Sequence, residues 1–158
     1  MAAEASTVTD AELVDRLTRQ RVDHDNKEYY RGWLQRRLLI NRCQECGRWH
    51  HPPKPVCPNC WSTDLRPTEV SGQGTVHLLM LLHQGPPAPG VDYSAGPHPV
   101  ATIELAEQTA LRLTSTVVDC PTDEIAIGMP VELTWIERDG APFPVFRPKA
   151  TATASVKR

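Results

Sequence analysis

Two closely spaced pairs of cysteines constrain this 158-residue chain more than any other feature of its sequence. Each pair has the spacing Cys-x-x-Cys, and ten residues separate Cys43 and Cys46 from Cys57 and Cys60. Two such turns facing each other bring four thiolates to one point, which is the ligand set of a tetrahedral structural zinc site. We therefore predict that these cysteines bind Zn²⁺. Because four thiolates leave no open coordination position, the metal would hold the shape of the chain and take no part in catalysis.

Three other interpretations of this region remain. Two disulfides would require an oxidising compartment, but residues 1–30 are polar and acidic and contain no apolar secretion-signal core, so we expect a cytoplasmic protein. A rubredoxin-like iron site uses the same four ligands, and only the short gap between the pairs favours zinc. His50 and His51 could replace a cysteine, but with four thiolates present we expect them to form an exposed surface pair.

The residues before the cysteines predict two short helices. A capping box that starts at Thr9 predicts a helix over about 10–21. A second helix is predicted over about 26–36, with a broad aromatic stripe on one side. The stripe consists of Tyr29, Tyr30 and Trp33. It either covers the core of this protein or docks in the groove of a partner, and the sequence leaves both open.

After the cysteines the hydrophobic period changes to that of β-strands. The first predicted strand, residues 75–83, is apolar on both faces, so it is either buried on both sides or completed by another chain. A long loop rich in proline and glycine follows over 84–99, and a hairpin is predicted across residues 107–108. The later strands are predicted over 100–106, 110–118, 131–135 and 143–147, with a single helical turn at 121–124. This set of short strands favours a small closed barrel of the OB type.

We therefore expect a mainly β protein with four parts. These are an N-terminal tail and helical segment (1–36), a four-cysteine zinc ribbon (37–66), an OB-fold barrel (67–148) and a flexible tail (149–158). A ribbon of about thirty residues is too small to bury a core of its own, so it must pack against its neighbours. No apolar run is long enough to span a membrane.

Charge is distributed unevenly along the chain. Residues 31–60 contain six basic and one acidic side chains, whereas residues 61–147 contain four and eleven. Even with four thiolates and Zn²⁺ added, the first segment keeps a charge of about +3. Its basic residues are Arg31, Arg36, Arg37, Arg42, Arg48 and Lys54. Such a patch can meet nucleic acid, a phosphate-bearing cofactor or the acidic face of a partner, or it can be an ordinary solvated surface.

A series of short motifs, taken in order over roughly residues 28–148, resembles the DUF35 family. The motifs are residues 39–43, Cys46-Gly47, Pro52-Pro53, Cys57-Pro58-x-Cys60, residues 71–76, 118–120, 127–131 and 146–148. The resemblance implies a rubredoxin-like zinc ribbon joined to an OB-fold. It also implies a non-catalytic partner of thiolase-fold enzymes that act on acyl-CoA, including aldolases that shorten steroid side chains. The chain departs from the family at residues 106–110, where relatives more often carry a glycine turn.

The first functional hypothesis is therefore an accessory subunit with a structural zinc ion. It would bind a thiolase-like enzyme subunit and could contribute to holding the CoA moiety. A heterotetramer of two chains of each kind would follow from the symmetry of a dimeric enzyme. The candidate residues for contact with the partner or with CoA are Tyr30, Trp33, Arg36, Arg37, Arg42 and Arg48.

Two other classes of function compete with an accessory subunit. Zinc ribbons and OB-folds also bind single-stranded nucleic acid, but the segment 61–147 has a net charge of −7 and few aromatic residues for stacking. An enzyme could use Cys120 as a nucleophile with His77, His83 or His98 as its base. The sequence around Cys120 contains neither a strained elbow nor a glycine-rich oxyanion loop, which argues against catalysis.

Overall fold

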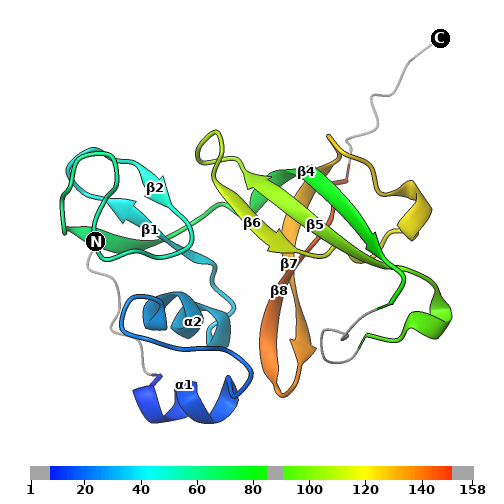
Figure 1. The fold of residues 1–158 in the computed structure, drawn as a ribbon, viewed down its shortest axis with the longest axis horizontal. Coiled ribbons are helices and arrows are strands. Elements are labelled where there is room, and N and C mark those ends of the chain that lie inside the picture. The colour runs from blue at the N-terminus through cyan, green and yellow to red at the C-terminus, as the bar shows by residue number, and fades with distance from the viewer. Residues whose placement is uncertain (1–7, 85–90, 151–158) are drawn as a thin grey trace.

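The computed structural model describes residues 8–84 and 91–150. In that part of the chain, two short helices precede a small ribbon sheet and a larger curled sheet (Figure 1). The helices are α1 (Asp10–Arg16) and α2 (Lys27–Leu34). The ribbon sheet has the order β2-β1-β3 and consists of β1 (Leu39–Cys43), β2 (Trp49–His50) and β3 (Leu65–Glu69). The curled sheet has the order β6-β5-β4-β7-β8 and consists of β4 (Gln73–Leu82), β5 (His98–Leu105), β6 (Arg112–Ser115), β7 (Pro130–Arg138) and β8 (Ala141–Pro148).

The first helix begins where the sequence predicts and ends earlier. The Thr9 hydroxyl accepts a hydrogen bond from the Glu12 N–H at 3.2 Å, so the capping box is present on that side. Leu13 and Leu17 are buried against the rest of the protein. Residues 18–21 offer no apolar side chain to continue this stripe, so the helix ends at Arg16 and not near residue 21.

The aromatic stripe of α2 covers the protein's own core. Tyr29 and Trp33 are buried, and the Trp33 ring lies edge-on to Phe143 of β8 with 5.2 Å between ring centroids. Tyr29 lies 5.2 Å from the ring of His51 in the ribbon. Together with Tyr30 these residues form an aromatic cluster where the helix, the ribbon and the curled sheet meet. Of the two roles that the sequence left open for the stripe, the structure shows the internal one.

A glycine allows the chain to turn back from α2 into β1. A Cβ atom at Gly32 would lie 2.4 Å from the Arg37 carbonyl oxygen and 2.8 Å from Cγ of Leu39. Any larger residue would push β1 away from the helix. The close approach is what places the ribbon directly above α2 (Figure 1).

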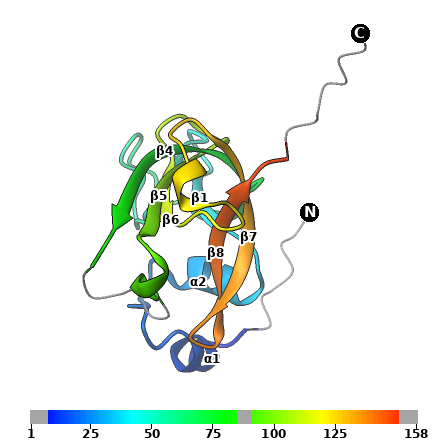
Figure 2. The same cartoon turned by 90° about the vertical axis from the view of Figure 1, so that its right-hand side faces the viewer.

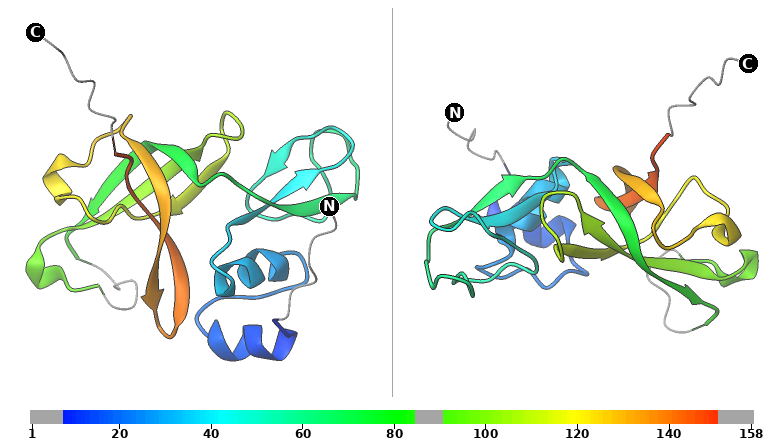
Figure 3. Two further views of the ribbon diagram at one scale, coloured as in Figure 1. Left: turned by 180° about the vertical axis from the view of Figure 1, so that it is seen from behind. Right: turned by 90° about the horizontal axis from the view of Figure 1, so that it is seen from above.

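The curled sheet is an OB-like half-barrel, so the predicted OB type is present. It curls far enough for β8 to meet the segment after β6, where the Val118 N–H donates to the Phe146 carbonyl at 2.8 Å and the Phe146 N–H donates to the Thr116 carbonyl at 3.0 Å. Its interior is filled by apolar side chains, among them Val76, Ile103, Leu105, Val131 and Phe146. The single helical turn before β7 is also present, at Thr122–Glu124. Seen from above, the helices and ribbon lie at one end of the molecule and the curled sheet at the other (Figure 3).

Two predictions around β4 need correction. Of the predicted loop over 84–99, residues 85–90 lie outside the described part of the chain. The remainder is not structureless, because Tyr93–Ala95 forms a 3-10 turn and β5 already begins at His98. The predicted hairpin is present between β5 and β6, but β6 is only four residues long.

Candidate metal centre and interaction surfaces

The four cysteines converge on one point from two equivalent turns. In the first turn the Gly47 N–H donates to the Cys43 carbonyl at 3.0 Å, and in the second the Trp61 N–H donates to the Cys57 carbonyl at 2.8 Å. All four sulfur atoms lie within 4.8 Å of one another.

Sulfur–sulfur distances identify the kind of site. Cys43 and Cys60 are 3.6 Å apart at Sγ, and Cys46 and Cys57 are 3.7 Å apart. A tetrahedral site with Zn–S bonds of about 2.3 Å requires about 3.8 Å between sulfurs, whereas a disulfide bond measures about 2.0 Å. The geometry therefore fits one bound metal ion and excludes disulfides among these cysteines.

The electrostatics of the turns favour thiolates that share a cation. The N–H of Arg48 and further donors lower the pKa of Cys46 to about 6. For Cys60, the Ser62 N–H acts in the same direction, but desolvation and the three neighbouring sulfurs outweigh it and raise its pKa to about 12. Four negative charges this close therefore cannot form without a cation, which Zn²⁺ supplies.

The two histidines between the cysteine pairs are not an exposed surface pair, so that prediction is wrong. His50 is buried, and its Nε2 lies 3.2 Å from the Sγ of Cys57, where a protonated Nε2 donates to the metal-binding thiolate. His51 packs against Tyr29, and burial lowers its pKa to about 4. The physical reason is the size of the ribbon, which has so few apolar residues that polar side chains must fill its interior.

Basic residues of the region 31–60 do not form one continuous patch. Arg36 makes an ion pair with Glu137 at 2.5 Å, and Arg37 makes one with Glu69 at 2.8 Å. Both arginines thus already have a carboxylate partner at the surface of the chain. Arg42 instead lies on the ribbon, with its guanidinium 5.3 Å from the centre of the Trp49 ring.

A second basic surface lies between the ribbon and the turn that joins β5 to β6. It is a groove of about 220 Å³ whose lining includes Arg48 and Lys54, and neither has a carboxylate partner among the described residues. Gln108 closes one side of this groove. Its side-chain amide accepts from the Trp49 N–H at 3.0 Å and donates to the Trp49 carbonyl at 3.2 Å. The β5–β6 turn is thus bound directly to β2 of the ribbon.

The two aromatic candidates differ in exposure. Trp33 is only 6% exposed, and its ring packs against Phe143 of β8 and is shielded from the solvent. Tyr30 is half-buried and its hydroxyl donates to Oε1 of Gln20 at 3.3 Å. Only Tyr30 of this pair lies at the surface, where a partner could reach it.

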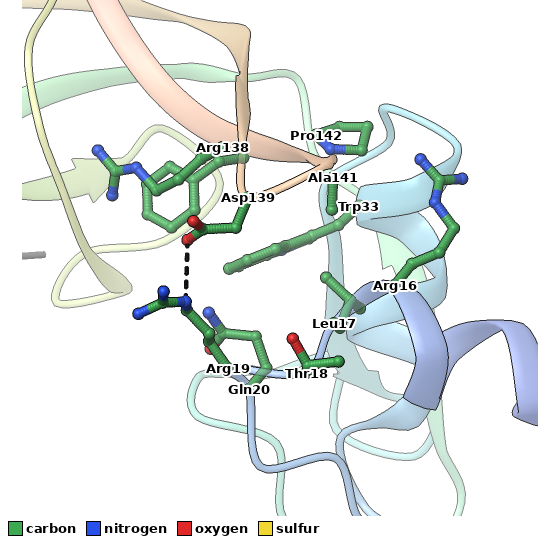
Figure 4. Close-up of a pocket in the computed structure, with 11 residues that line it drawn as sticks. Arg16, Leu17, Thr18, Arg19, Gln20, Trp33, Arg138, Asp139, Ala141 and Pro142 are labelled. Carbon is green, nitrogen blue, oxygen red and sulfur yellow. Dashed lines mark ion pairs between the residues drawn. The ribbon is translucent and has the colours of Figure 1, made fainter. Parts of the chain in front are cut away.

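A small cavity lies beside Trp33, between α1 and the turn that joins β7 to β8 (Figure 4). Arg19 and Asp139 form an ion pair of 3.5 Å across its mouth, and Arg16 donates to the Gly140 carbonyl at 3.4 Å. The cavity measures about 30 Å³, which is room for a single water molecule. It is a packing seam and not a site for a substrate.

Cys120 does not have the environment of a nucleophile. Burial raises the pKa of its thiol, and the nearby carboxylates of Glu124 and Asp123 raise it further. Its Sγ donates to the Pro121 carbonyl at 3.5 Å, and no described histidine makes a hydrogen bond to it.

Among the described residues, the side chains that lie close enough together to hold a metal ion are those of the four ribbon cysteines.

The described helices give no sign of a membrane span. None of those within residues 8–84 and 91–150 is both long and apolar enough to cross a bilayer.

A four-thiolate ribbon joined to a curled five-stranded sheet defines a zinc-ribbon and OB-fold protein. Family models agree with this division: the rubredoxin-like zinc ribbon domain of ChsH2 matches residues 31–66, and the ChsH2 C-terminal OB-fold domain matches residues 67–135. A DUF35 domain-containing scaffold protein of Methanocaldococcus jannaschii is 33% identical over 123 residues, which cover 73% of this chain and 83% of that protein. The chain belongs to the DUF35 family. The predicted fold and the predicted structural zinc ribbon are confirmed.

Two further similarities connect the chain to larger assemblies. It is 41% identical over 131 residues to a probable enoyl-CoA hydratase alpha subunit of Thermomonospora curvata, a match that covers 82% of this chain and 39% of the relative. The chain thus spans about two fifths of that protein. A chain of the solved structure described as "Ltp2-ChsH2(DUF35) aldolase" superposes with a TM-score of 0.73 at 41% identity, covering 82% of this chain and 98% of that one.

Proposed function

We propose that this chain is a non-catalytic subunit that binds and supports a thiolase-fold enzyme acting on acyl-CoA substrates. The observation that carries the proposal is the similarity, over almost the whole length of the matched chain, to a component of a structure described as an Ltp2-ChsH2(DUF35) aldolase. An aldolase of steroid side-chain degradation is accordingly the partner that we favour. We expect two copies of each chain in the assembly, because a symmetric enzyme dimer presents two equivalent docking sites.

The chemistry of the described residues supports a structural role for this subunit. The metal centre has four thiolates and no open position, and Cys120 is held as a neutral thiol. No other described cluster combines a nucleophile with a base. What the chain offers instead is surface, so its contribution to a reaction would be made through a partner.

Nucleic-acid binding receives no support from the same surfaces. Phe146, one of the few aromatic residues of the curled sheet, is fully buried. Arg112 and Arg147 on that sheet are paired with Glu104 and Glu132. A basic groove with exposed stacking rings, as single-stranded nucleic acid needs, is therefore missing from the described barrel.

For contact with CoA phosphates or an acidic partner face we propose Arg42 and Arg48, with Lys54 in the same groove as Arg48. These side chains lack carboxylate partners among the described residues, so their charges remain available. Arg36 and Arg37 are candidates of lower rank because each already forms a surface ion pair within the chain. Tyr30 would contribute from the surface of α2, while Trp33 would act only by supporting Tyr30 from behind.

The test is co-expression with the thiolase-like subunit from the same source. We expect a single size-exclusion peak that contains both chains and about one zinc ion per copy of this chain, with lower aldolase activity or solubility of the enzyme when this chain is omitted. Cys120→Ala should leave the activity of the complex unchanged. Two separate peaks together with a fully active enzyme alone would overturn the proposal.

The basic residues are tested in the same complex. Replacing Arg42 and Arg48 with Gln should raise the KM for the acyl-CoA substrate, or weaken binding of the enzyme, by about tenfold, which corresponds to about 1.4 kcal/mol. Arg66→Gln, at a ribbon arginine that pairs with Asp64 at 3.0 Å and is not among the candidates, is the control and should change neither. Unchanged KM and affinity in the double variant would remove the arginine assignment and leave the accessory role standing.

A further inference from the structure

The two halves of β4 have different neighbours. Its first residues, 73–75, pair with β7 on one side and lead into the buried Val76. The Val76 backbone still bonds to that side through the Met129 carbonyl and the Gly128 N–H. A bulge then interrupts the strand between Val76 and Leu78, and residues 78–82 pair with β5 alone. In Figure 2 the end of β4 runs away from β7 and β8 along the outer edge of the molecule.

The register shows which main-chain groups face this free edge. Leu81 is opposite Pro99, which has no N–H to donate. The Pro99 carbonyl accepts from Oγ1 of Thr116 at 2.6 Å, so it points toward β6 and away from β4. The N–H and C=O of Leu81 therefore point away from β5, and by the alternation of an antiparallel ladder those of Leu79 do the same. No described residue pairs with them.

The side chains around this edge are apolar on both faces and carry no charge. Leu78, Met80 and Leu82 project from one face and are 45%, 47% and 36% exposed. Leu81, on the opposite face, is 42% exposed. The sequence from residue 73 to residue 84 contains no Asp, Glu, Lys or Arg, and neither does the stretch of β5 that pairs with residues 78–82.

Two other strands at sheet borders in the described part of the chain, β3 and β6, have features that protect their free edges. β3 borders the ribbon sheet and carries Arg66, Pro67 and Glu69, residues that prevent a further strand from adding. β6 is four residues long, begins with Arg112 and leads into the seam with β8. The free half of β4 has neither charge nor proline, so nothing in its sequence prevents another strand from pairing with it.

We propose that the edge formed by residues 78–82 of β4 is completed by an extended segment of the thiolase-like enzyme subunit, which adds to the sheet as a further strand. This inference rests on the proposed function, which supplies the partner. Unpaired N–H and C=O groups along an edge are satisfied by a strand and not by the side of a helix. Because both faces are apolar and neutral, the added segment has apolar side chains on both of its faces and no charged residue opposite Leu79 and Leu81.

Two variants test the edge, each with its control. Met80→Lys places a charge on the exposed face, and Leu81→Pro removes the N–H that faces the free edge, a position where proline leaves the internal ladder intact. Leu81→Ala is the control that keeps this N–H, and Thr114→Lys is the control on the exposed face of β6. We expect Met80→Lys and Leu81→Pro to weaken binding of the enzyme subunit at least a hundredfold. Thr114→Lys should leave affinity unchanged, and Leu81→Ala should weaken it much less than Leu81→Pro. Zinc content and thermal unfolding of each free variant should match those of the unaltered chain.

Hydrogen exchange of the complex provides an independent measurement. The amides of Leu79 and Leu81 should exchange rapidly in the free chain and at least a hundredfold more slowly in the complex. If the complex forms and both variants bind as tightly as the unaltered chain, the edge is not the docking site and the accessory role stands. If the free chain is instead a dimer that Met80→Lys separates, a second copy occupies the edge and the inference is overturned. Failure of the unaltered chain to bind the enzyme would remove the proposed function and this inference with it.

Discussion

The fully buried side chains of the ribbon include two metal ligands, Cys43 and Cys57, whereas those of the curled sheet include Ile103, Val131 and Phe146. In the ribbon, sulfur atoms and a buried histidine occupy the positions that apolar side chains fill in the sheet. The ribbon therefore depends on coordination bonds for its shape, and the sheet depends on burial of apolar surface. The comparison teaches that one short chain can contain two regions whose stabilities respond to different conditions.

Replacing one of the metal-binding cysteines should give the largest difference in stability between the ribbon and the curled sheet. Cys57→Ser should abolish zinc binding, because isolated zinc fingers derive on the order of 10 kcal/mol from the metal. The expected result is loss of hydrogen-exchange protection in β1 to β3, with protection retained in β5, β7 and β8. Cys120→Ser, outside the site, should keep the full zinc content. A ribbon that stays protected without zinc would refute the metal-dependent half of the comparison.

The reverse change is a cavity in the curled sheet. Phe146→Ala should lower the free energy of unfolding by about 3–5 kcal/mol, because the side chain is fully buried in the core. This fall in the free energy of unfolding can be measured by denaturant unfolding, with hydrogen exchange to show that it arises in the curled sheet. The zinc content of the folded protein should not change. Ile127→Ala, at a site that is 65% exposed, should cost less than about 0.5 kcal/mol.

A pH effect is expected where the ribbon meets α2. Burial lowers the pKa of His51 to about 4, so between about pH 6.5 and 4 the unfolded chain binds a proton that the folded chain does not. The stabilisation is complete above that range and is lost as pH falls through it, by about 3 kcal/mol in total. Between pH 7 and pH 5 the unaltered chain should lose about 2 kcal/mol more stability than His51→Phe does. His24→Phe, at a side chain that is 93% exposed, should show the pH dependence of the unaltered chain.

The smallest effect concerns the two turns of the metal site. Gly47 and Trp61 occupy equivalent positions and both have left-handed backbones, with φ of 73° and 64°. Gly47→Ala should therefore destabilise the ribbon by about 1 kcal/mol, while Trp61→Gly should stabilise it by about 0.5 kcal/mol. Thermal unfolding of the zinc-loaded protein measures both. Trp61→Ala keeps the strained backbone, so equal gains from Ala and Gly at this position would contradict the explanation.

Sequence reasoning succeeded where the determining signal is local. The spacing of the cysteines fixes the ligand set, and alternating side chains reveal the strands of the curled sheet even though their ends shift by a few residues. It missed β1, β2 and β3, because metal coordination and not apolar alternation organises these strands. It also misplaced His50, since the shortage of apolar residues in the ribbon becomes visible only when the chain is folded.

Pairing between distant residues was out of reach of the sequence. Arg36 meets Glu137 across 101 positions and Arg37 meets Glu69 across 32, so a patch that is basic in sequence becomes partly neutral in space. The role of Trp33 likewise depends on Phe143, which arrives from the last strand of the sheet. Such contacts arise from the topology, which a motif does not encode.

The turn at residues 106–110, between β5 and β6, has a mechanical consequence. The side-chain amide of Gln108 makes two hydrogen bonds with the backbone of Trp49, as a residue of a neighbouring strand would. The edge strand β2 of the ribbon is thus hydrogen-bonded to the turn between β5 and β6. The two halves consequently cannot rotate apart as rigid bodies without fraying β2. A partner that displaces the curled sheet would therefore also pull on β2 and on the metal-binding turns next to it. The two halves would move together and not independently.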